Sequence, residues 1–225
     1  MPYDGRKVLS NGQMRNEDQS LLRNIAGWTR CGILPLLLTV LYILISFSDR
    51  HFLSDRLVHL QIRCTGGGYE LAINGRTHRA EAGAVPPGNK IGFYVWHRGE
   101  PEPEQTFFRN LKVESLDDAN STLKLSLTDE RQAAQFRQPS CAAQSGLVSR
   151  DAQWNISEGE GLHSQSGTPG ASLVFADGFE AANFVMSADI VYPFDAGLLF
   201  HADEQGNGEI LTVRPPYNDA LLFSV

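Results

Sequence analysis

Short segments in which apolar and polar side chains alternate, separated by turn residues, recur along most of the chain after residue 55. Residues 57–63 read LVHLQIR, so every second side chain is apolar, as in a strand with one buried face. A second alternating segment, residues 69–73, runs into Asn74-Gly75. This dipeptide favours a two-residue hairpin, because both central positions of a type I′ turn need positive φ. The pattern predicts an all-β fold.

Further strands are expected at residues 76–80, 90–96, 107–114, 171–175, 183–191, 196–202, 209–214 and 220–225. A spacing of roughly 10–12 residues between short strands is typical of a β-sandwich or jelly roll. Residues 117–153 are rich in Asp, Ser, Gln and Ala and are expected to form a connector. Within it, a short strand is expected near residues 123–127 and a helical turn near residues 130–136.

Residues 31–48 carry no charge and read CGILPLLLTVLYILISFS. As a helix this segment would be about 27 Å long, close to the ~30 Å thickness of the bilayer core. A cleaved signal peptide is the alternative, but the 30 residues before the segment are long for an n-region. We expect a retained single-pass anchor with residues 1–30 in the cytoplasm and the C-terminal part outside it. The arginines on the two sides of the segment balance each other, and Arg6 and Lys7 favour this orientation.

Two stretches resemble known motifs. The run FVMSADIVYPFDAGLLFHADEQGNGEILTV is similar to the first half of concanavalin A-like, laminin-G-like jelly rolls, including those appended to invertase and levanase type proteins. The segments LVHLQIRCTGGGYELAINGR, KIGFYVW and FFRNLKV resemble the second half of the same domain type. The resemblance implies a concanavalin A-like β-sandwich.

The two halves stand in permuted order, with second-half motifs in residues 55–116 and first-half motifs in residues 154–225. Because the termini of such domains commonly lie close together, a circular permutation is tolerable. We expect the halves to pack as one composite domain, since a half-sandwich would expose its apolar face. The alternative is two incomplete domains in tandem.

No complete catalytic motif is recognisable in the sequence. Retaining glucanases on this fold place paired carboxylates along one strand, and no such run is present. The chain also resembles 3-keto-disaccharide hydrolase-like domains, in which an acidic residue follows the hairpin; Glu209 occupies that place. Catalysis by Glu209 is therefore the alternative to a solvated carboxylate that opens a strand, which is the interpretation preferred here.

Glycan binding needs aromatic rings beside polar groups, and the candidates are Tyr94, Trp96, His97, His201, Arg214 and Tyr217. Each also has a structural interpretation. Tyr94 and Trp96 alternate with apolar residues and can belong to a core, and His201 can be a polar residue at a strand end. We expect a membrane-anchored module that binds carbohydrate or protein; a scaffold without a ligand remains the third possibility.

The sequence also bears on calcium, a disulfide and nucleic acid. Asp203 and Asn207 lie in an acidic, glycine-rich loop that suits calcium, although a plain hairpin turn needs the same residues. No other cofactor is expected. Cys64 and Cys141 can form one disulfide or remain two free thiols. The formal charge of −7 argues against nucleic acid as a partner.

Overall fold

The computed structural model describes residues 56–66, 68–81, 88–99, 105–118, 120–139 and 152–224. They form a two-sheet antiparallel β-sandwich, compatible with a jelly-roll fold. The predicted tail (residues 1–30), the predicted membrane span (residues 31–48) and Cys141 lie outside the described residues. Among the residues described, no helix is long and apolar enough to cross a membrane.

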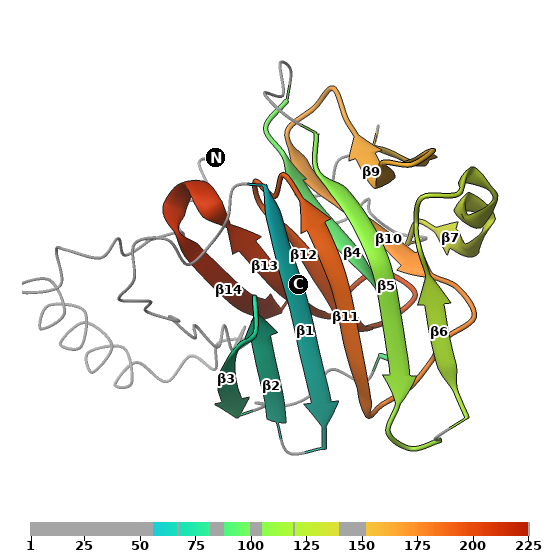
Figure 1. Cartoon of the computed structure of the whole chain (residues 1–225), viewed down its shortest axis with the longest axis vertical. Coiled ribbons are helices and arrows are strands. Elements are labelled where there is room, and N and C mark those ends of the chain that lie inside the picture. Colours follow the sequence, from blue (N-terminus) through green and yellow to red (C-terminus); the bar gives the residue numbers. More distant parts are fainter. Residues whose placement is uncertain are drawn as a thin grey trace, which may run out of the picture.

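Sheet A is eight-stranded and lies in front in Figure 1. Its order is β3 (Arg76–Glu81), β2 (Gly68–Ile73), β1 (Leu57–Thr65), β11 (Phe184–Val191), β5 (Phe107–Ser115), β9 (Gly161–Gln165) and β8 (Gln153–Ser157), and β6 (Thr122–Leu125) pairs with β5.

Sheet B is six-stranded and lies behind sheet A. Its order is β14 (Asp219–Ser224), β13 (Glu209–Arg214), β12 (Ala196–Ala202), β4 (Lys90–His97), β10 (Gly170–Ala176) and β7 (Phe136–Arg137). Two short 3₁₀ helices complete the described elements: η1 (Glu130–Gln135) and η2 (Pro215–Tyr217).

Each sheet contains strands from both the early and the late part of the chain. In sheet A, β11 lies between β1 and β5, and its pairing with β1 runs from Leu57 opposite Val191 to Cys64 opposite Phe184. In sheet B, β4 lies between β12 and β10. Residues 57–115 and 153–224 therefore share every layer of the sandwich.

The main core lies between the sheets and follows from the alternation in the sequence. Val58, Leu60 and Ile62 of β1 are fully buried, while His59 and Arg63 on the opposite face are exposed. Fully burying an aliphatic side chain of this size stabilises the fold by roughly 1.5–3 kcal/mol. The sandwich is thus held chiefly by inward-facing apolar side chains from both sheets.

The predicted hairpin is confirmed, because Asn74 and Gly75 have φ values of 49° and 79°. The other strands predicted from alternation are also present, with ends shifted by at most two residues. Three strands were not predicted: β7, β8 and β9. In β8 and β9 the polar residues Asn155, His163 and Ser164 interrupt the apolar pattern, so period-two alternation could not reveal them.

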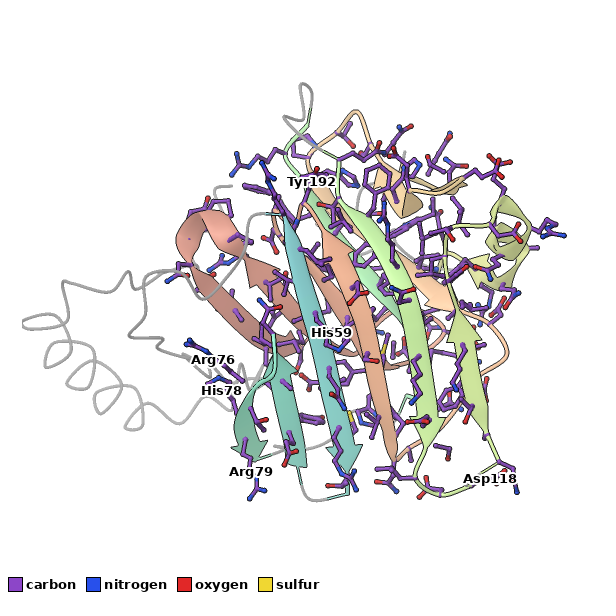
Figure 2. The ribbon with its side chains drawn as sticks, in the orientation of Figure 1. His59, Arg76, His78, Arg79, Asp118 and Tyr192 are labelled. Carbon is purple, nitrogen blue, oxygen red and sulfur yellow. The ribbon has the colours of Figure 1, made fainter. Side chains whose placement is uncertain are left out.

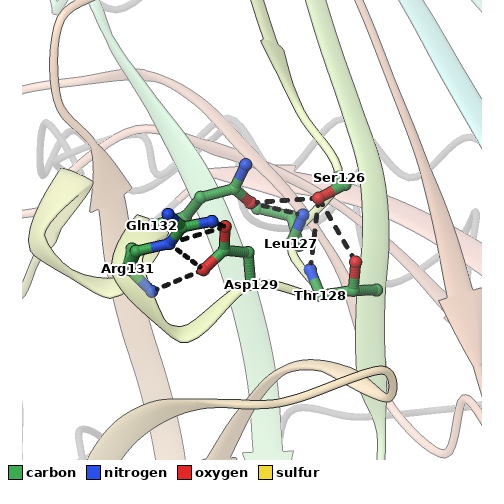
Figure 3. A network of polar contacts seen from close by, with 6 residues as sticks. All are labelled: Ser126, Leu127, Thr128, Asp129, Arg131 and Gln132. Atoms are coloured by element: carbon green, nitrogen blue, oxygen red, sulfur yellow. Dashed lines mark hydrogen bonds and ion pairs between the residues drawn. The ribbon is translucent and has the colours of Figure 1, made fainter.

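The predicted connector contributes a strand to each sheet, β6 to sheet A and β7 to sheet B. Between β6 and β7 the chain turns, and the polar network drawn in Figure 3 stabilises this turn. Gln132 Oε1 accepts hydrogen bonds from the Leu127 amide (2.8 Å) and from Ser126 Oγ (3.3 Å). Asp129 caps η1 by accepting from the Arg131 amide (3.0 Å). This turn holds the Leu127 side chain in the core at positive φ (64°).

A polar bridge joins the two sheets at the end near His97. His97 Nε2 lies 3.0 Å from Ser164 Oγ of β9, which donates to Ser172 Oγ of β10 (2.8 Å). All three residues are buried. Paired buried polar groups of this kind rigidify a core, because each would be costly to bury alone. His97, a predicted glycan contact, therefore lies inside the sandwich.

Candidate functional site

Four predicted contact residues lie on one surface, the face of sheet B turned away from sheet A. In β4, Phe93 and Val95 point into the main core, so Tyr94 and Trp96 point outward. In β13, Leu211 and Val213 point inward, which places Arg214 on the outer face. The outer face is itself largely apolar and buried, with a cluster formed by Tyr94, Ala171, Leu173, Phe175, Leu199, Ala202 and Ile210.

Tyr94 belongs to this apolar cluster. Its ring is 3% exposed and meets the Phe223 ring edge to face, with centroids 6.0 Å apart. Such pairs stabilise packing by about 0.5–1.5 kcal/mol beyond their buried area. Of the two interpretations of Tyr94, the structure favours core packing.

Arg214 and Tyr217 form the most distinctive arrangement on this surface. Arg214 is 4% exposed, and its guanidinium donates from Nε to Asp219 Oδ1 (2.8 Å) and from Nη2 to Asp219 Oδ2 (2.5 Å). The guanidinium carbon lies 5.1 Å from the centre of the Tyr217 ring, within the range of a cation–π contact. The Tyr217 ring is 49% exposed.

The turn between β13 and β14 creates this geometry. The sequence PPYN forms η2, where proline supplies the required φ and Asn218 closes the turn in the left-handed conformation at φ 51°. The Asn218 amide donates to the Pro215 carbonyl (2.9 Å). The chain then returns with Asp219 directly opposite Arg214. Local sequence therefore places the carboxylate that fixes the guanidinium.

Asp195 connects Trp96 with Arg214 and was not predicted. The Trp96 amide donates to the Asp195 carbonyl (2.8 Å), and Thr212 Oγ1 donates to Asp195 Oδ1 (2.9 Å). We call Trp96, Asp195, Thr212, Arg214, Tyr217 and Asp219 the rim cluster. Asp195 stands just before β12, and no pattern in the sequence separates it from an ordinary turn aspartate.

The rim cluster holds one guanidinium, that of Arg214, and two carboxylates, those of Asp195 and Asp219. Burial opposes the positive charge of Arg214, but the hydrogen bonds and charge of Asp219, with a further contribution from Asp195, outweigh burial and raise the pKa of Arg214. The guanidinium is therefore permanently charged and tightly held.

Two glycines lie on the outer face of the central strands beside Tyr94. Gly197 is directly opposite Tyr94, and Gly92 is opposite Leu199. A Cβ atom on either glycine would lie 1.8 Å from a neighbouring carbonyl oxygen, that of Leu211 for Gly197 and that of Val174 for Gly92. Only glycine fits at these positions.

His201 lies elsewhere, between the sheets. β12 carries one extra residue relative to β4 after Leu199, and His201 takes a φ of 49° in this bulge. The bulge turns its imidazole inward, with ring centroids 5.4 Å from Phe184 and 6.1 Å from Tyr69. Burial lowers the pKa of His201, opposed by a hydrogen bond with the Gly88 backbone. His201 is thus a buried residue of the bulge and is separate from the rim cluster.

The interpretation of Glu209 as a solvated carboxylate is wrong. Glu209 is 8% exposed and faces the interior, because it precedes the inward-facing Leu211 by two residues. Burial raises its pKa, while the hydrogen bond that Ser224 Oγ donates to Oε1 (2.8 Å) lowers it. Burial, and then the charge of Glu209, raise the pKa of Cys64 and of Tyr69. Neither Cys64 nor Tyr69 is a carboxylate, so neither supplies the second carboxylate of a glycosidase pair.

Asp203 and Asn207 form a self-satisfied hairpin loop. Asp203 Oδ1 accepts from the amides of Gln205 (2.9 Å) and Asn207 (3.0 Å), and Oδ2 accepts from Asn207 Nδ2 (2.8 Å). Glu204 ties the loop to Lys90 (3.2 Å) and Arg137 (2.9 Å). Within the described part of the chain, no group of three or more His, Cys, Asp or Glu side chains is placed to hold a metal ion.

Cys64, predicted as one partner of a possible disulfide, is a free thiol buried in β1 of sheet A. Burial raises its pKa, so the thiolate is disfavoured at neutral pH. Its proposed partner, Cys141, lies outside the described residues.

No protein-family model matches the chain, and no curated protein matches it either.

Proposed function

We propose that the sandwich is a concanavalin A-like, carbohydrate-binding module and that the rim cluster is its contact site. The observation that carries the proposal is the half-exposed Tyr217, whose ring lies within cation–π range of a buried guanidinium that Asp219 holds through two hydrogen bonds. The half-buried Trp96 and the buried Asp195 and Thr212 adjoin it.

This arrangement suits a sugar because a sugar ring has both apolar C–H faces and polar hydroxyls. An aromatic ring offers an apolar surface with little conformational freedom to lose on binding. The Arg214–Asp219 pair holds Tyr217 in place before a ligand arrives, which lowers the entropic cost of association. The negative net charge favours a neutral glycan over an anionic one.

The test is a glycan array probed with the purified full-length protein, followed by titration of any glycan bound. Tyr217→Ala should weaken binding at least about tenfold, as expected for an aromatic contact worth more than about 1.4 kcal/mol. Tyr217→Phe keeps the ring and should bind nearly as the natural chain does. A blank array, or equal binding by Tyr217→Ala, would contradict the proposal.

Tyr192→Asn is the matched control. Tyr192 is 41% exposed, outside the rim cluster, and has a φ of 52°. Asparagine tolerates this left-handed conformation, so the substitution removes an exposed ring with little backbone strain. Binding by this variant should equal that of the natural chain.

The membrane anchor is also a proposal and rests on the uncharged residues 31–48. Deletion of these residues should move the protein from the membrane fraction to the soluble fraction. Persistence of the deleted protein in membranes after washing with salt would refute the anchor.

A hydrolase that uses Glu209 is the second candidate, and one observation favours it: a buried carboxyl with a raised pKa is what a general acid needs. Turnover of a 3-keto-disaccharide by the purified protein, lost in Glu209→Gln, would establish it. Absence of turnover in the natural chain would dismiss it.

A further inference from the structure

His59, Asp189 and Asn110 form a hydrogen-bonded trio on the outer face of sheet A, the opposite side of the sandwich from the rim cluster. His59 Nδ1 lies 2.7 Å from Asp189 Oδ1, and Asn110 Nδ2 donates to Asp189 Oδ2 (2.7 Å). The residues come from the adjacent strands β1, β11 and β5. Figure 2 labels His59 in front of these strands.

The backbone departs from regular β geometry to assemble the trio. Pairing of β11 with β5 shifts between Ser187 and Asp189, where β5 carries one extra residue. Asn110, in this bulge, has a φ of 54°. Bulges re-aim side chains and asparagine tolerates positive φ, so the bulge places the Asn110 amide within hydrogen-bond distance of Asp189.

The contacts determine which ring nitrogen of His59 is available. One oxygen of the Asp189 carboxylate faces Nδ1 of His59, and the other accepts a hydrogen bond from Asn110 Nδ2. Because a carboxylate can only accept, Nδ1 of His59 carries the hydrogen of this bond, and in the Nδ1–H tautomer Nε2 keeps its lone pair. The His59 side chain is 49% exposed, against 23% for Asp189.

The backbone of His59 is pinned as well. Its amide donates to Asn74 Oδ1 (2.9 Å), and the Asn74 amide donates to the His59 carbonyl (2.9 Å). The hairpin turn on one side and Asp189 on the other thus hold the imidazole in one orientation. A pre-oriented acceptor loses less entropy when it binds a ligand.

We propose that Nε2 of His59 accepts a hydrogen bond from a hydroxyl group of a polyhydroxylated ligand, with Asp189 and Asn110 as positioning residues. Further polar groups stand in the same and the next cross-strand rows: Arg109, Gln61, Ser187 and Lys112. Of these, Arg109 already donates from Nε to the Glu160 carbonyl, and Lys112 pairs with Glu114 (2.8 Å). The charged groups facing His59 across this surface are Asp189, Arg63, Glu70, Arg109, Lys112 and Glu114. This site does not depend on the rim cluster.

The experiment is nitrogen NMR of the histidine rings in the full-length protein, titrated with methyl β-glucoside and with glycerol. His59 should show the Nδ1–H form, and its Nε2 signal should shift on addition of either probe. An Nε2 signal unmoved by both probes at neutral pH overturns the proposal.

Variants separate a binding role from a structural one. His59→Gln should lose probe binding while the unfolding midpoint changes little, and Asp189→Ala should move ring hydrogen toward Nε2 and weaken binding about tenfold. Lys124→Gln, exposed on the same sheet, is the control and should behave as the natural chain. Unchanged binding in His59→Gln, or an unchanged tautomer in Asp189→Ala, refutes the proposal.

Failure here is distinguishable from failure of the rim cluster. Loss of glycan binding in Tyr217→Ala with normal binding in His59→Gln rejects the trio and retains the rim cluster. Loss in His59→Gln with normal binding in Tyr217→Ala supports the trio and rejects the rim cluster.

Discussion

Ser224 Oγ donates a hydrogen bond of 2.8 Å to Glu209 Oε1 across the β13–β14 pair. Glu209 is buried, and this hydroxyl counters the burial that raises its pKa. The two residues stand directly opposite each other, so the bond follows from strand register. The carboxyl end of β14 is thus fastened to the start of β13.

Ser224→Ala removes the hydroxyl and leaves the buried carboxylate without that donor. Hydrogen bonds to charged groups contribute about 1.5–3 kcal/mol, and we expect a loss of that order in the free energy of unfolding at neutral pH. The loss should be smaller in acid, where the carboxyl is protonated. Urea unfolding at neutral and acidic pH measures both values. An equal loss at both would show that the charge is not involved.

Glu209→Gln should change how stability depends on pH. Because burial raises the pKa of Glu209 in the folded state, the fold binds this proton more tightly than the unfolded chain does. The resulting stabilisation is fully present below the unfolded pKa and is lost as pH rises through the folded pKa. The natural chain should therefore lose stability relative to Glu209→Gln over that window. Carboxylates with a lowered pKa, such as Glu180 and Glu204, also make stability depend on pH. Their contribution is the same in both proteins and drops out of the difference. A constant difference at all pH values would contradict the prediction.

His201 should reverse the usual ranking of alanine and glycine. Both His201→Ala and His201→Gly remove the buried ring, but only glycine adopts a φ of 49° without strain. His201→Gly should be more stable than His201→Ala by about 1 kcal/mol. At Leu199, in the regular part of β12, alanine should be the better replacement. Thermal unfolding of the alanine and glycine variants at His201 and at Leu199 measures both rankings. If alanine is the more stable replacement at both sites, the bulge at His201 is not strained.

Asp219→Asn should be strongly destabilising, because it leaves the Arg214 guanidinium buried without its carboxylate. Loss of one partner of a buried ion pair typically costs about 3–5 kcal/mol. Replacing both residues, Arg214→Met with Asp219→Leu, should cost much less, since no charge stays buried. Chemical denaturation of both variants measures the difference. A cost below about 1 kcal/mol for Asp219→Asn would indicate that solvent screens the pair.

Much of the strand layout could be predicted from local patterns. Val58, Leu60 and Ile62 alternate with polar residues, and they are buried as predicted. Asn74-Gly75 forms the expected hairpin, since positive φ is a local property of these residue types. β8 and β9 were not predicted, because they bury polar side chains such as His163. Burial of these side chains depends on partners distant in sequence, including Gln105.

The candidate sites depended more heavily on tertiary structure. Trp96 and Arg214 were predicted as contacts, but Asp195, which lies between them, carries no distinguishing sequence signal. His59 looks like any exposed residue of an alternating strand until Asp189 is placed beside it, 130 residues away.

The sequence alone determined most of the extended segments, the Asn74-Gly75 turn and the apolar face of alternating strands such as β1, because these properties depend on neighbours one to four residues away. Tertiary structure decided that β11 lies between β1 and β5, that Glu209 points into the core and that His201 occupies a bulge. Strand order, register and bulges are set by pairing between distant segments. The energies of that pairing depend on both partners at once, and so no local pattern records them.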